Sequence, residues 1–180
     1  MYHGHFTSNT TDDGLHSNGN ITISNGNFTI TSSDDGTHAD GMIEITGGTF
    51  SINAHEGIEA TYVKINDGTI NISASDDGIN AGNKSSAYEV AIEINGGSIT
   101  INMGQGDTDA VDSNGNIYVN GGTINITGQS AFDYDGTAKY TAGTIIVNGV
   151  ETNTITNQMI GGGMQGGQGG NMGPQGGRMR

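Results

Sequence analysis

A short acidic motif recurs along the chain at an almost fixed interval of 21 or 22 residues. Typically an acidic residue is followed by a small residue, an apolar residue and then a polar or charged one, although Thr37 takes the apolar place in the second copy. Copies begin at Asp13, Asp35, Glu56, Asp77 and Asp109, and a degenerate copy begins at Ser130. The interval after Asp77 is 32 residues, mainly because of an insertion at residues 83–91. A period of this size is typical of repeat architectures, in which each copy packs on its neighbours.

Apolar-polar-apolar triplets lie on either side of a glycine turn in each copy. Ile43-Glu44-Ile45 and Phe50-Ser51-Ile52, for example, flank Gly48. Strict alternation predicts strands with one buried face, and glycine suits the turn between them. A third apolar unit follows the acidic residue, as in Ile58 and Ala60. Helices are not indicated, because β-branched residues alternate at period two and glycine is frequent throughout.

Three short strands in about 21 residues match one coil of a parallel β-helix, whose like residues stack roughly 4.8 Å apart. We therefore expect an all-β fold, a single-stranded parallel β-helix of about six coils, right-handed by analogy with most such solenoids. A sandwich or barrel would have longer strands without a fixed period. The β-helix domain is predicted to occupy residues 1–160, with residues 150–160 as a cap over the last coil. Residues 161–180 contain ten glycines and predict a flexible tail.

The excess of acidic residues restricts the classes of molecule that the chain can bind. The chain carries 19 Asp and Glu against five Lys and Arg, a net charge of −14. We therefore expect no nucleic-acid partner, because the body repels polyanions. We also expect no membrane insertion, because no apolar run approaches the length of a spanning segment. The absence of cysteine excludes a disulfide scaffold and a thiolate metal site.

Stacked coils place the acidic residues of successive copies about 5 Å apart. Two such carboxylates repel by about 1 kcal/mol in water and by more at a lower dielectric, so a ladder raises its own pKa values or recruits a cation. Calcium, with six to eight oxygen ligands, is the favoured cation. A single Asp-Gly pair is explained equally well by turn chemistry and solubility. The predicted ligands are Asp35, Glu56, Glu59 and Asp77 in one group, and Asp109 and Asp112 in a second.

Two histidines occupy the same place in adjacent copies. His16 and His38 each lie three residues after the acidic residue. They could ligate a transition metal, but no third soft ligand accompanies them. We interpret them as a stacked pair of solvated turn residues.

A family resemblance is carried by the segments DDGLHSNGNITISNG, DDGTHADGMIEITGG and EGIEATYVKINDGTINISASDDGINA, and by the Gly/Met/Gln-rich tail. Residues 12 to about 150 resemble the bacterial carbohydrate-binding β-helix proteins, a group related to calcium-binding cellulose and polygalacturonate binders of clostridial cell surfaces. The resemblance implies a secreted or surface-displayed right-handed parallel β-helix with calcium in its acidic turns. It also implies binding of plant cell-wall polysaccharide without established catalysis.

Evidence for sugar binding in the residues themselves is limited, since the chain has no tryptophan to serve as a stacking platform. Tyr118 is expected to point outward from a strand. Lys84 and Tyr88 belong to the insertion, which we expect to form a rim outside the coils. These three residues are the predicted ligand-binding residues. An acidic polymer would need bridging calcium, because the acidic body otherwise repels it.

Two other functions compete with polysaccharide binding. A lyase would need a basic group near bound calcium, and Lys64 is the candidate in the body, although no arginine precedes Arg178 to clamp a substrate carboxylate. We expect no catalysis. A structural filament or matrix would form if the open ends of the coils stacked in an end-to-end homo-assembly.

Overall fold

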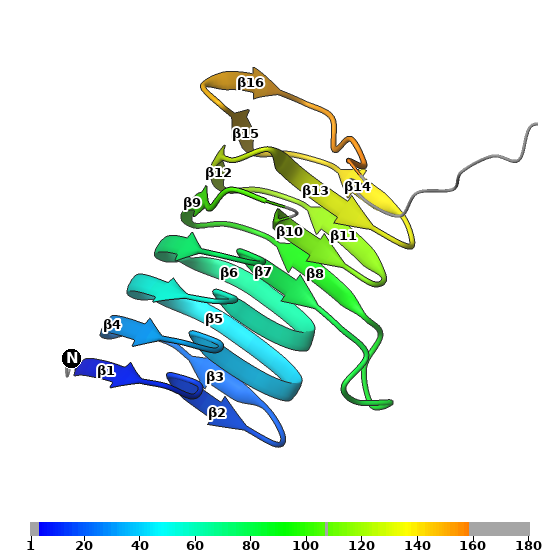
Figure 1. The fold of residues 1–180 in the computed structure, drawn as a ribbon. Coiled ribbons are helices and arrows are strands. Elements are labelled where there is room, and N and C mark those ends of the chain that lie inside the picture. Colours follow the sequence, from blue (N-terminus) through cyan, green and yellow to red (C-terminus); the bar gives the residue numbers. More distant parts are fainter. Residues whose placement is uncertain (1–3, 107, 159–180) are drawn as a thin grey trace, which may run out of the picture.

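The computed structural model of the protein describes residues 4–106 and 108–158, and this part of the chain contains strands and turns without a helix. The strands stack in coils from β1 at one end to β15 and β16 at the other (Figure 1). Their bounds are β1 His5–Thr10, β2 Leu15–Ser17, β3 Ile21–Ile23, β4 Asn27–Ser32, β5 Thr37–Ala54, β6 Ile58–Ala74, β7 Ile79–Ala81, β8 Ala91–Ile94, β9 Ser98–Met103, β10 Asp109–Ser113, β11 Asn116–Val119, β12 Thr123–Thr127, β13 Ser130–Tyr134, β14 Ala138–Tyr140, β15 Thr144–Val147 and β16 Val150–Thr152.

The described residues form a parallel β-solenoid of about six coils, as the repeat predicts. Coil 1 contains β2 to β4, coil 2 is β5, coil 3 is β6, coil 4 contains β7 to β9, coil 5 contains β10 to β12 and coil 6 contains β13 to β15. β5 and β6 run continuously around their coils, with register shifts at the corners. β1 belongs to a partial coil before coil 1 and pairs with β4. Right-handed winding stays a prediction.

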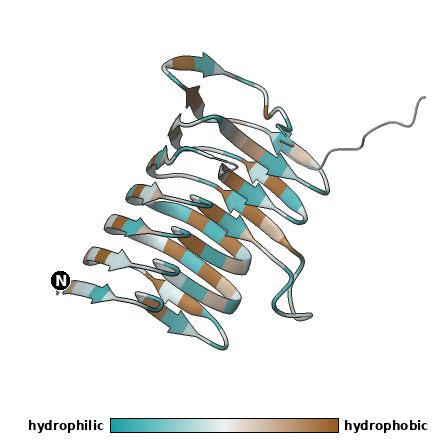
Figure 2. Ribbon diagram, in the orientation of Figure 1, coloured by the Kyte–Doolittle hydropathy of each residue, from teal (hydrophilic) through white to brown (hydrophobic). Residues whose placement is uncertain are grey.

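The pairing register places like residues over like residues. One inward row runs through Phe28, Phe50, Ile70, Ile99, Ile124 and Ile145. Hydrophobic and hydrophilic residues alternate along the strands, as the brown and teal bands of Figure 2 show. The inward Ile, Val, Ala and Phe side chains form one narrow buried core. Burial of each Ile contributes about 1.5–3 kcal/mol, so the apolar rows hold the coils together.

In the first four copies a glycine follows the acidic residue, and the close approach of neighbouring coils requires it. A Cβ atom on Gly57 would lie 2.3 Å from the carbonyl oxygen of Gly78. A Cβ on Gly36 would lie 2.5 Å from the carbonyl oxygen of Gly57. Both distances are far inside ordinary contact, so a larger residue would force the coils apart. The Asp-Gly pair, explained from sequence as turn chemistry, is therefore also a packing device.

The two ends of the solenoid differ. At the far end β16 pairs antiparallel with β15, and Ile155 packs against the core. The Gln158 amide donates to the Phe132 carbonyl over 2.8 Å, so the segment after β15 covers the last coil, as predicted. At the other end β1, β2 and β3 pair on one side only. The predicted tail, residues 161–180, lies outside the described residues, and the domain boundary at residue 160 stays a prediction.

The insertion projects from the coils between β7 and β8, as expected (Figure 1), but it is also bonded to them. In this insertion loop (residues 82–90), the backbone amides of Lys84 and Ser85 donate to the hydroxyl of Thr61 over 3.0 and 2.8 Å. The side-chain amide of Asn20 donates to the Tyr88 hydroxyl over 2.7 Å. These hydrogen bonds to the coils, which the sequence did not indicate, hold the rim in place. Within the described residues, no helix is long and apolar enough to span a membrane.

Candidate functional site

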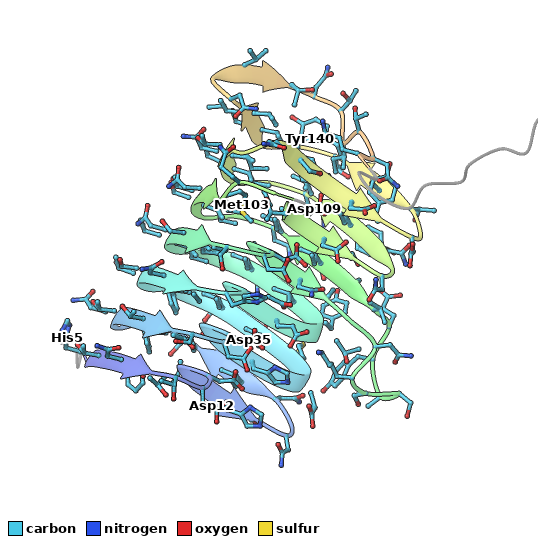
Figure 3. The ribbon with its side chains drawn as sticks, viewed as in Figure 1. His5, Asp12, Asp35, Met103, Asp109 and Tyr140 are labelled. Atoms are coloured by element: carbon cyan, nitrogen blue, oxygen red, sulfur yellow. The ribbon has the colours of Figure 1, made fainter. Side chains whose placement is uncertain are left out.

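The acidic residues of the repeat form two neighbouring rows along one side of the solenoid. The first row contains Asp13, Asp35, Glu56, Asp77 and Asp109 in successive coils, joined by backbone bonds of 2.8–3.0 Å from the following glycines. The second row contains His16, His38, Glu59, Asn80, Asp112 and Asp133, which pair in register. Figure 3 labels Asp35 and Asp109, which lie along the same side of the stack.

A network of opposite charges lies where coils 2 and 3 meet. The Nδ1 atom of His38 is 2.8 Å from Asp35 Oδ2 and 2.7 Å from Glu59 Oε2. Lys84 from the insertion loop forms an ion pair with the other oxygen of Glu59. Asp35 and Glu59 are both only 6% exposed, so this charge network is largely shielded from solvent.

The histidines stack as predicted, but they are strand residues of β2 and β5 rather than turn residues, and His38 is not solvated. Its ring stacks on that of His16, with 5.0 Å between ring centroids and 19° between planes. His16 is exposed, whereas His38 is turned into the carboxylates of Asp35 and Glu59. The bridging role of His38 was not predicted. The pairing of His38 with Glu59 in the repeat alignment is the signal that could have indicated it.

Burial and like charge raise the pKa values of several carboxyl groups in the two rows. Burial, followed by the charge of Asp112, raises the pKa of Asp77 to about 8. Burial, followed by the charge of Asp133, raises the pKa of Asp112 to about 7. Burial and the neighbouring Glu59 also raise the pKa values of Asp35 and Glu56 above the ordinary range. Burial, and to a lesser extent like charge, therefore opposes full ionisation of these carboxyl groups.

The structure divides the predicted metal ligands differently from the sequence. Asp35 and Glu59 share a cluster with His38 in which ligand atoms lie within 4.8 Å of one another. Glu56 belongs to a separate cluster with His55 and Asp76. Within residues 4–106 and 108–158, Asp77, Asp109 and Asp112 join no group of three such atoms at that distance. The four residues of the first predicted group therefore do not form a single ligand shell in this conformation.

Coils 4 to 6 hold the second acidic group. The Asp109 amide donates to Asp77 Oδ1 over 3.2 Å, and the Ser130 hydroxyl donates to Asp109. Asp112 lies in register between Asn80 and Asp133. The Oδ1 atoms of Asn80 and Asp133 are buried and have no hydrogen-bond partner among the described residues. Buried acceptors without donors are costly, so this part of the row is suited to an added donor or cation.

A different, uncharged surface lies on the sheet formed by β4, the ends of β5 and β6, β9 and β12. Its outward side chains are Thr, Ser and Asn in three parallel rows. The rows in β5, β6, β9 and β12 are Thr49, Thr69, Ser98 and Thr123; Ser51, Asn71, Thr100 and Asn125; and Asn53, Ser73, Asn102 and Thr127. We call this surface the polar face. None of these twelve side chains is ionisable, in contrast to the acidic rows.

Tyr118 and Lys64 lie in another outward row, separate from the acidic rows and the polar face, on β11 and β6. Lys64 pairs in register with Glu44 on one side and Glu93 on the other. Tyr118 follows Glu93 in the same row and is half-exposed on β11, as predicted. Lys64 therefore belongs to a different strand segment of its coil from Glu56 and Glu59.

Comparison with known proteins identifies the family. A family model described as "Carbohydrate-binding domain-containing protein" matches residues 2–60 and 37–169. No functionally curated protein matches the chain. A solved structure described as "Structure of the polysaccharide lyase-like protein from C. thermocellum, Gadolinium derivative" is 26% identical with a TM-score of 0.51, covering 77% of this chain and 51% of that chain. This chain thus spans about half the length of that protein. Because the family match extends over most of the sequence, the chain belongs to the carbohydrate-binding domain-containing family.

Proposed function

We propose that this protein is a calcium-stabilised, extracellular module that binds a cell-wall polysaccharide, cellulosic or pectic, without cleaving it. The observation that carries the proposal is the polar face, where hydroxyl and amide groups repeat at the coil spacing across stacked strands. In a chain of net charge −14, this face is uncharged. Regular donors and acceptors on a rigid scaffold suit a polymer whose hydroxyl groups also repeat. Membership of a carbohydrate-binding family supports the same assignment.

The proposed calcium ligands are the six acidic residues predicted from the sequence, with the stronger site in coils 4 to 6. Near Asp35 and Glu59, His38 and Lys84 already offset part of the negative charge. Near Asp77 and Asp112 the described residues place no cation, and the buried oxygens of Asn80 and Asp133 lack donors. Carboxylate and amide oxygens are the ligands that calcium prefers.

Calcium binding is tested by thermal unfolding of the full chain in calcium and in chelator. A ligand at 100 times its Kd stabilises by about 2.7 kcal/mol, or about 5–10 °C for a chain of this size. The double variant Asp77→Asn, Asp112→Asn should lose most of that increase. Asp12→Asn is the control, because Asp12 is exposed in the first coil. Equal melting temperatures of the wild-type protein in calcium and in chelator would refute the site.

Lys84, Tyr88 and Tyr118 remain proposed sugar contacts, but they lie away from the polar face, in the loop between β7 and β8 and on β11 (Figure 1). Tyr118 offers its half-exposed ring from β11. Lys84 and Tyr88 also bind Glu59 and Asn20, so they would contact sugar as fixed groups rather than as a mobile rim.

A polysaccharide lyase is the second candidate, favoured by the description of the similar structure as polysaccharide lyase-like. We propose binding instead, because the candidate bases are poorly placed. Lys64 lies in the row of Glu44 and Glu93, and Lys84 is ion-paired with Glu59. A protonated amine in an ion pair is a weak general base at neutral pH.

The function is tested by sedimentation of the full chain with insoluble cellulose, xylan and calcium pectate. We expect retention on at least one polymer in calcium, weaker retention in chelator, and no released sugar. Failure to bind all three would refute the proposal. Ultraviolet-absorbing unsaturated uronides in the supernatant would identify a lyase. Large assemblies that form regardless of sugar would support the filament alternative, in which the unpaired edges of β1 to β3 dock on another copy.

A further inference from the structure

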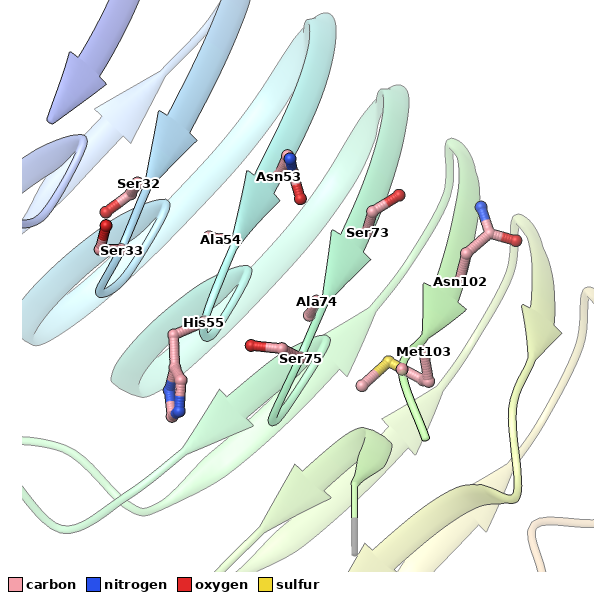
Figure 4. A pocket seen from close by; sticks show the side chains of 11 residues that line it. Ser32, Ser33, Asn53, Ala54, His55, Ser73, Ala74, Ser75, Asn102 and Met103 are labelled. Carbon is pink, nitrogen blue, oxygen red and sulfur yellow. The ribbon is translucent and has the colours of Figure 1, made fainter. Parts of the chain in front are cut away.

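A groove borders the polar face where β4, β5, β6 and β9 end (Figure 4). It has a volume of about 490 Å³. One wall is the outward row of Asn53, Ser73 and Asn102, and the other is the turn row that contains His55 and Ser75. Figure 4 shows the first three side chains arranged in sequence along successive coils. The groove therefore runs along the solenoid axis, across the strands.

The groove exists because its floor is made of small residues. Ala54 and Ala74 are buried and pair in register at the ends of β5 and β6. Two residues earlier in the same strands, the inward positions are Ile52 and Ile72. Loss of three side-chain carbons at each step lowers the surface between the two walls. In coil 4 the residue in register with Ala74 is Met103, so the alanine floor belongs to coils 2 and 3.

A second hollow of about 250 Å³ continues along the same line over coils 5 and 6. Its lining includes Thr127, Gly128, Gln129 and Asn148, and it shares Met103 and Gly104 with the first. We call the two together the axial groove. From coil 1 to coil 6 the stacking distance is roughly 24 Å, at about 4.8 Å per coil. That shape fits an extended chain rather than a compact small molecule.

The lining of the axial groove is neutral and available for hydrogen bonding. Among its described residues none is Asp, Glu, Lys or Arg, and His55 is the one titratable side chain. The side chains of Asn53, Ser73 and Asn102 are exposed and bond to none of the described residues. These amides and hydroxyls can form hydrogen bonds with the hydroxyl groups of a sugar chain. The described lining offers no Lys or Arg to form an ion pair with a carboxylate-bearing polymer.

We infer that the axial groove binds a single chain of neutral, linear polysaccharide lying parallel to the solenoid axis. The inference rests on the proposed function and selects a neutral glycan over a pectic one. Asn53, Ser73 and Asn102 would then hydrogen-bond the chain from one side, and Ala54 and Ala74 leave room for it.

The test compares two triple variants of the full chain in titrations with cellohexaose, xylohexaose and hexagalacturonate. The first, Asn53→Ala, Ser73→Ala, Asn102→Ala, removes the polar groups of one groove wall. The second, Thr22→Ala, Asn114→Ala, Thr141→Ala, alters exposed residues that lie outside both the polar face and the groove. Circular dichroism and the melting temperature confirm that both variants fold.

For at least one neutral hexasaccharide, the groove variant should raise the Kd by about tenfold or more, as expected for the loss of two or more net hydrogen bonds. The control should raise it by less than about twofold. The inference is overturned if the wild-type protein binds and the groove variant binds equally well. Preferential loss of hexagalacturonate binding would overturn it too. A wild-type protein that binds no hexasaccharide but sediments with insoluble polymer refutes the groove while preserving the proposed function, whereas binding to nothing refutes both.

Discussion

Replacing Gly57 by alanine tests whether the close approach of the coils sets the spacing of the acidic ladder. The added Cβ would lie 2.3 Å from the Gly78 carbonyl oxygen and 2.6 Å from Cγ2 of Ile72. Relief requires coils 3 and 4 to separate by about 1 Å locally, since ordinary contact begins near 3.4 Å. That separation would break the bonds from the Gly57 and Ile58 amides to coil 4, which are 2.9 and 3.2 Å long.

The expected loss follows from these contacts. Two backbone bonds contribute about 1 kcal/mol each, and overpacking in a dense interior costs about 1–3 kcal/mol. The smaller entropy of the unfolded chain offsets up to about 1 kcal/mol. A net loss of about 3 kcal/mol lowers the melting temperature by about 6–12 °C for a chain of this length.

Thermal unfolding followed by circular dichroism measures this shift, with Gly82→Ala as the matched control. A Cβ on Gly82 would meet its nearest atoms at 3.6 and 3.8 Å, which is ordinary contact. The control should therefore melt within about 4 °C of the wild-type protein. If Gly57→Ala melts as high as the control, the close approach of the coils is not what excludes a side chain there.

Three further predictions concern the charges and the core. In chelator, the melting temperature should fall as the pH rises from about 5 to 8. Burial raises the pKa of Asp77 to about 8, so the folded state holds a proton that the unfolded chain releases near pH 4. Asp77→Asn should flatten this dependence on pH, and an unchanged slope in the variant would contradict the assignment. Ile72→Asp should lower the urea midpoint strongly, because it buries an unpaired carboxylate, whereas Asn71→Asp on the polar face should be mild; similar midpoints would mean that the strand register is wrong. Lys84→Met should lower the melting temperature at pH 7 by removing the ion pair with Glu59, and no change would show that the insertion loop contributes nothing to the fold.

The coil itself could be predicted because one alignment contains nearly all of its information. Aligning the copies places Ile58, Ile79 and Val111 in one row, and the structure pairs these residues. Period-two alternation then decides which side chains face the core. The corners were less predictable: β5 and β6 continue through turns where the sequence indicates separate short strands.

The charged site could be predicted only in outline. The repeat identifies which acidic residues stack, but it does not reveal that His38 inserts between Asp35 and Glu59. Nor does it place Lys84, because the insertion has no counterpart in other copies and therefore no register. The sequence contains the small residues Ala54 and Ala74 of the groove floor. It does not show that polar side chains stand on both sides of them, so it does not predict the axial groove.

The hydrogen bond between Tyr88 and Asn20 should affect local unfolding of the first coil. Each coil of a solenoid packs on its immediate neighbours, so an uncovered terminal coil can fray by itself. The hydrogen bond between these side chains links coil 4 to coil 1 across 68 residues of sequence. Opening of β2 and β3 then requires release of the insertion loop as well, which joins the first four coils into one cooperative unit. Faster amide hydrogen exchange in β2 and β3 of Tyr88→Phe, with β12 unchanged, would be the sign of that coupling.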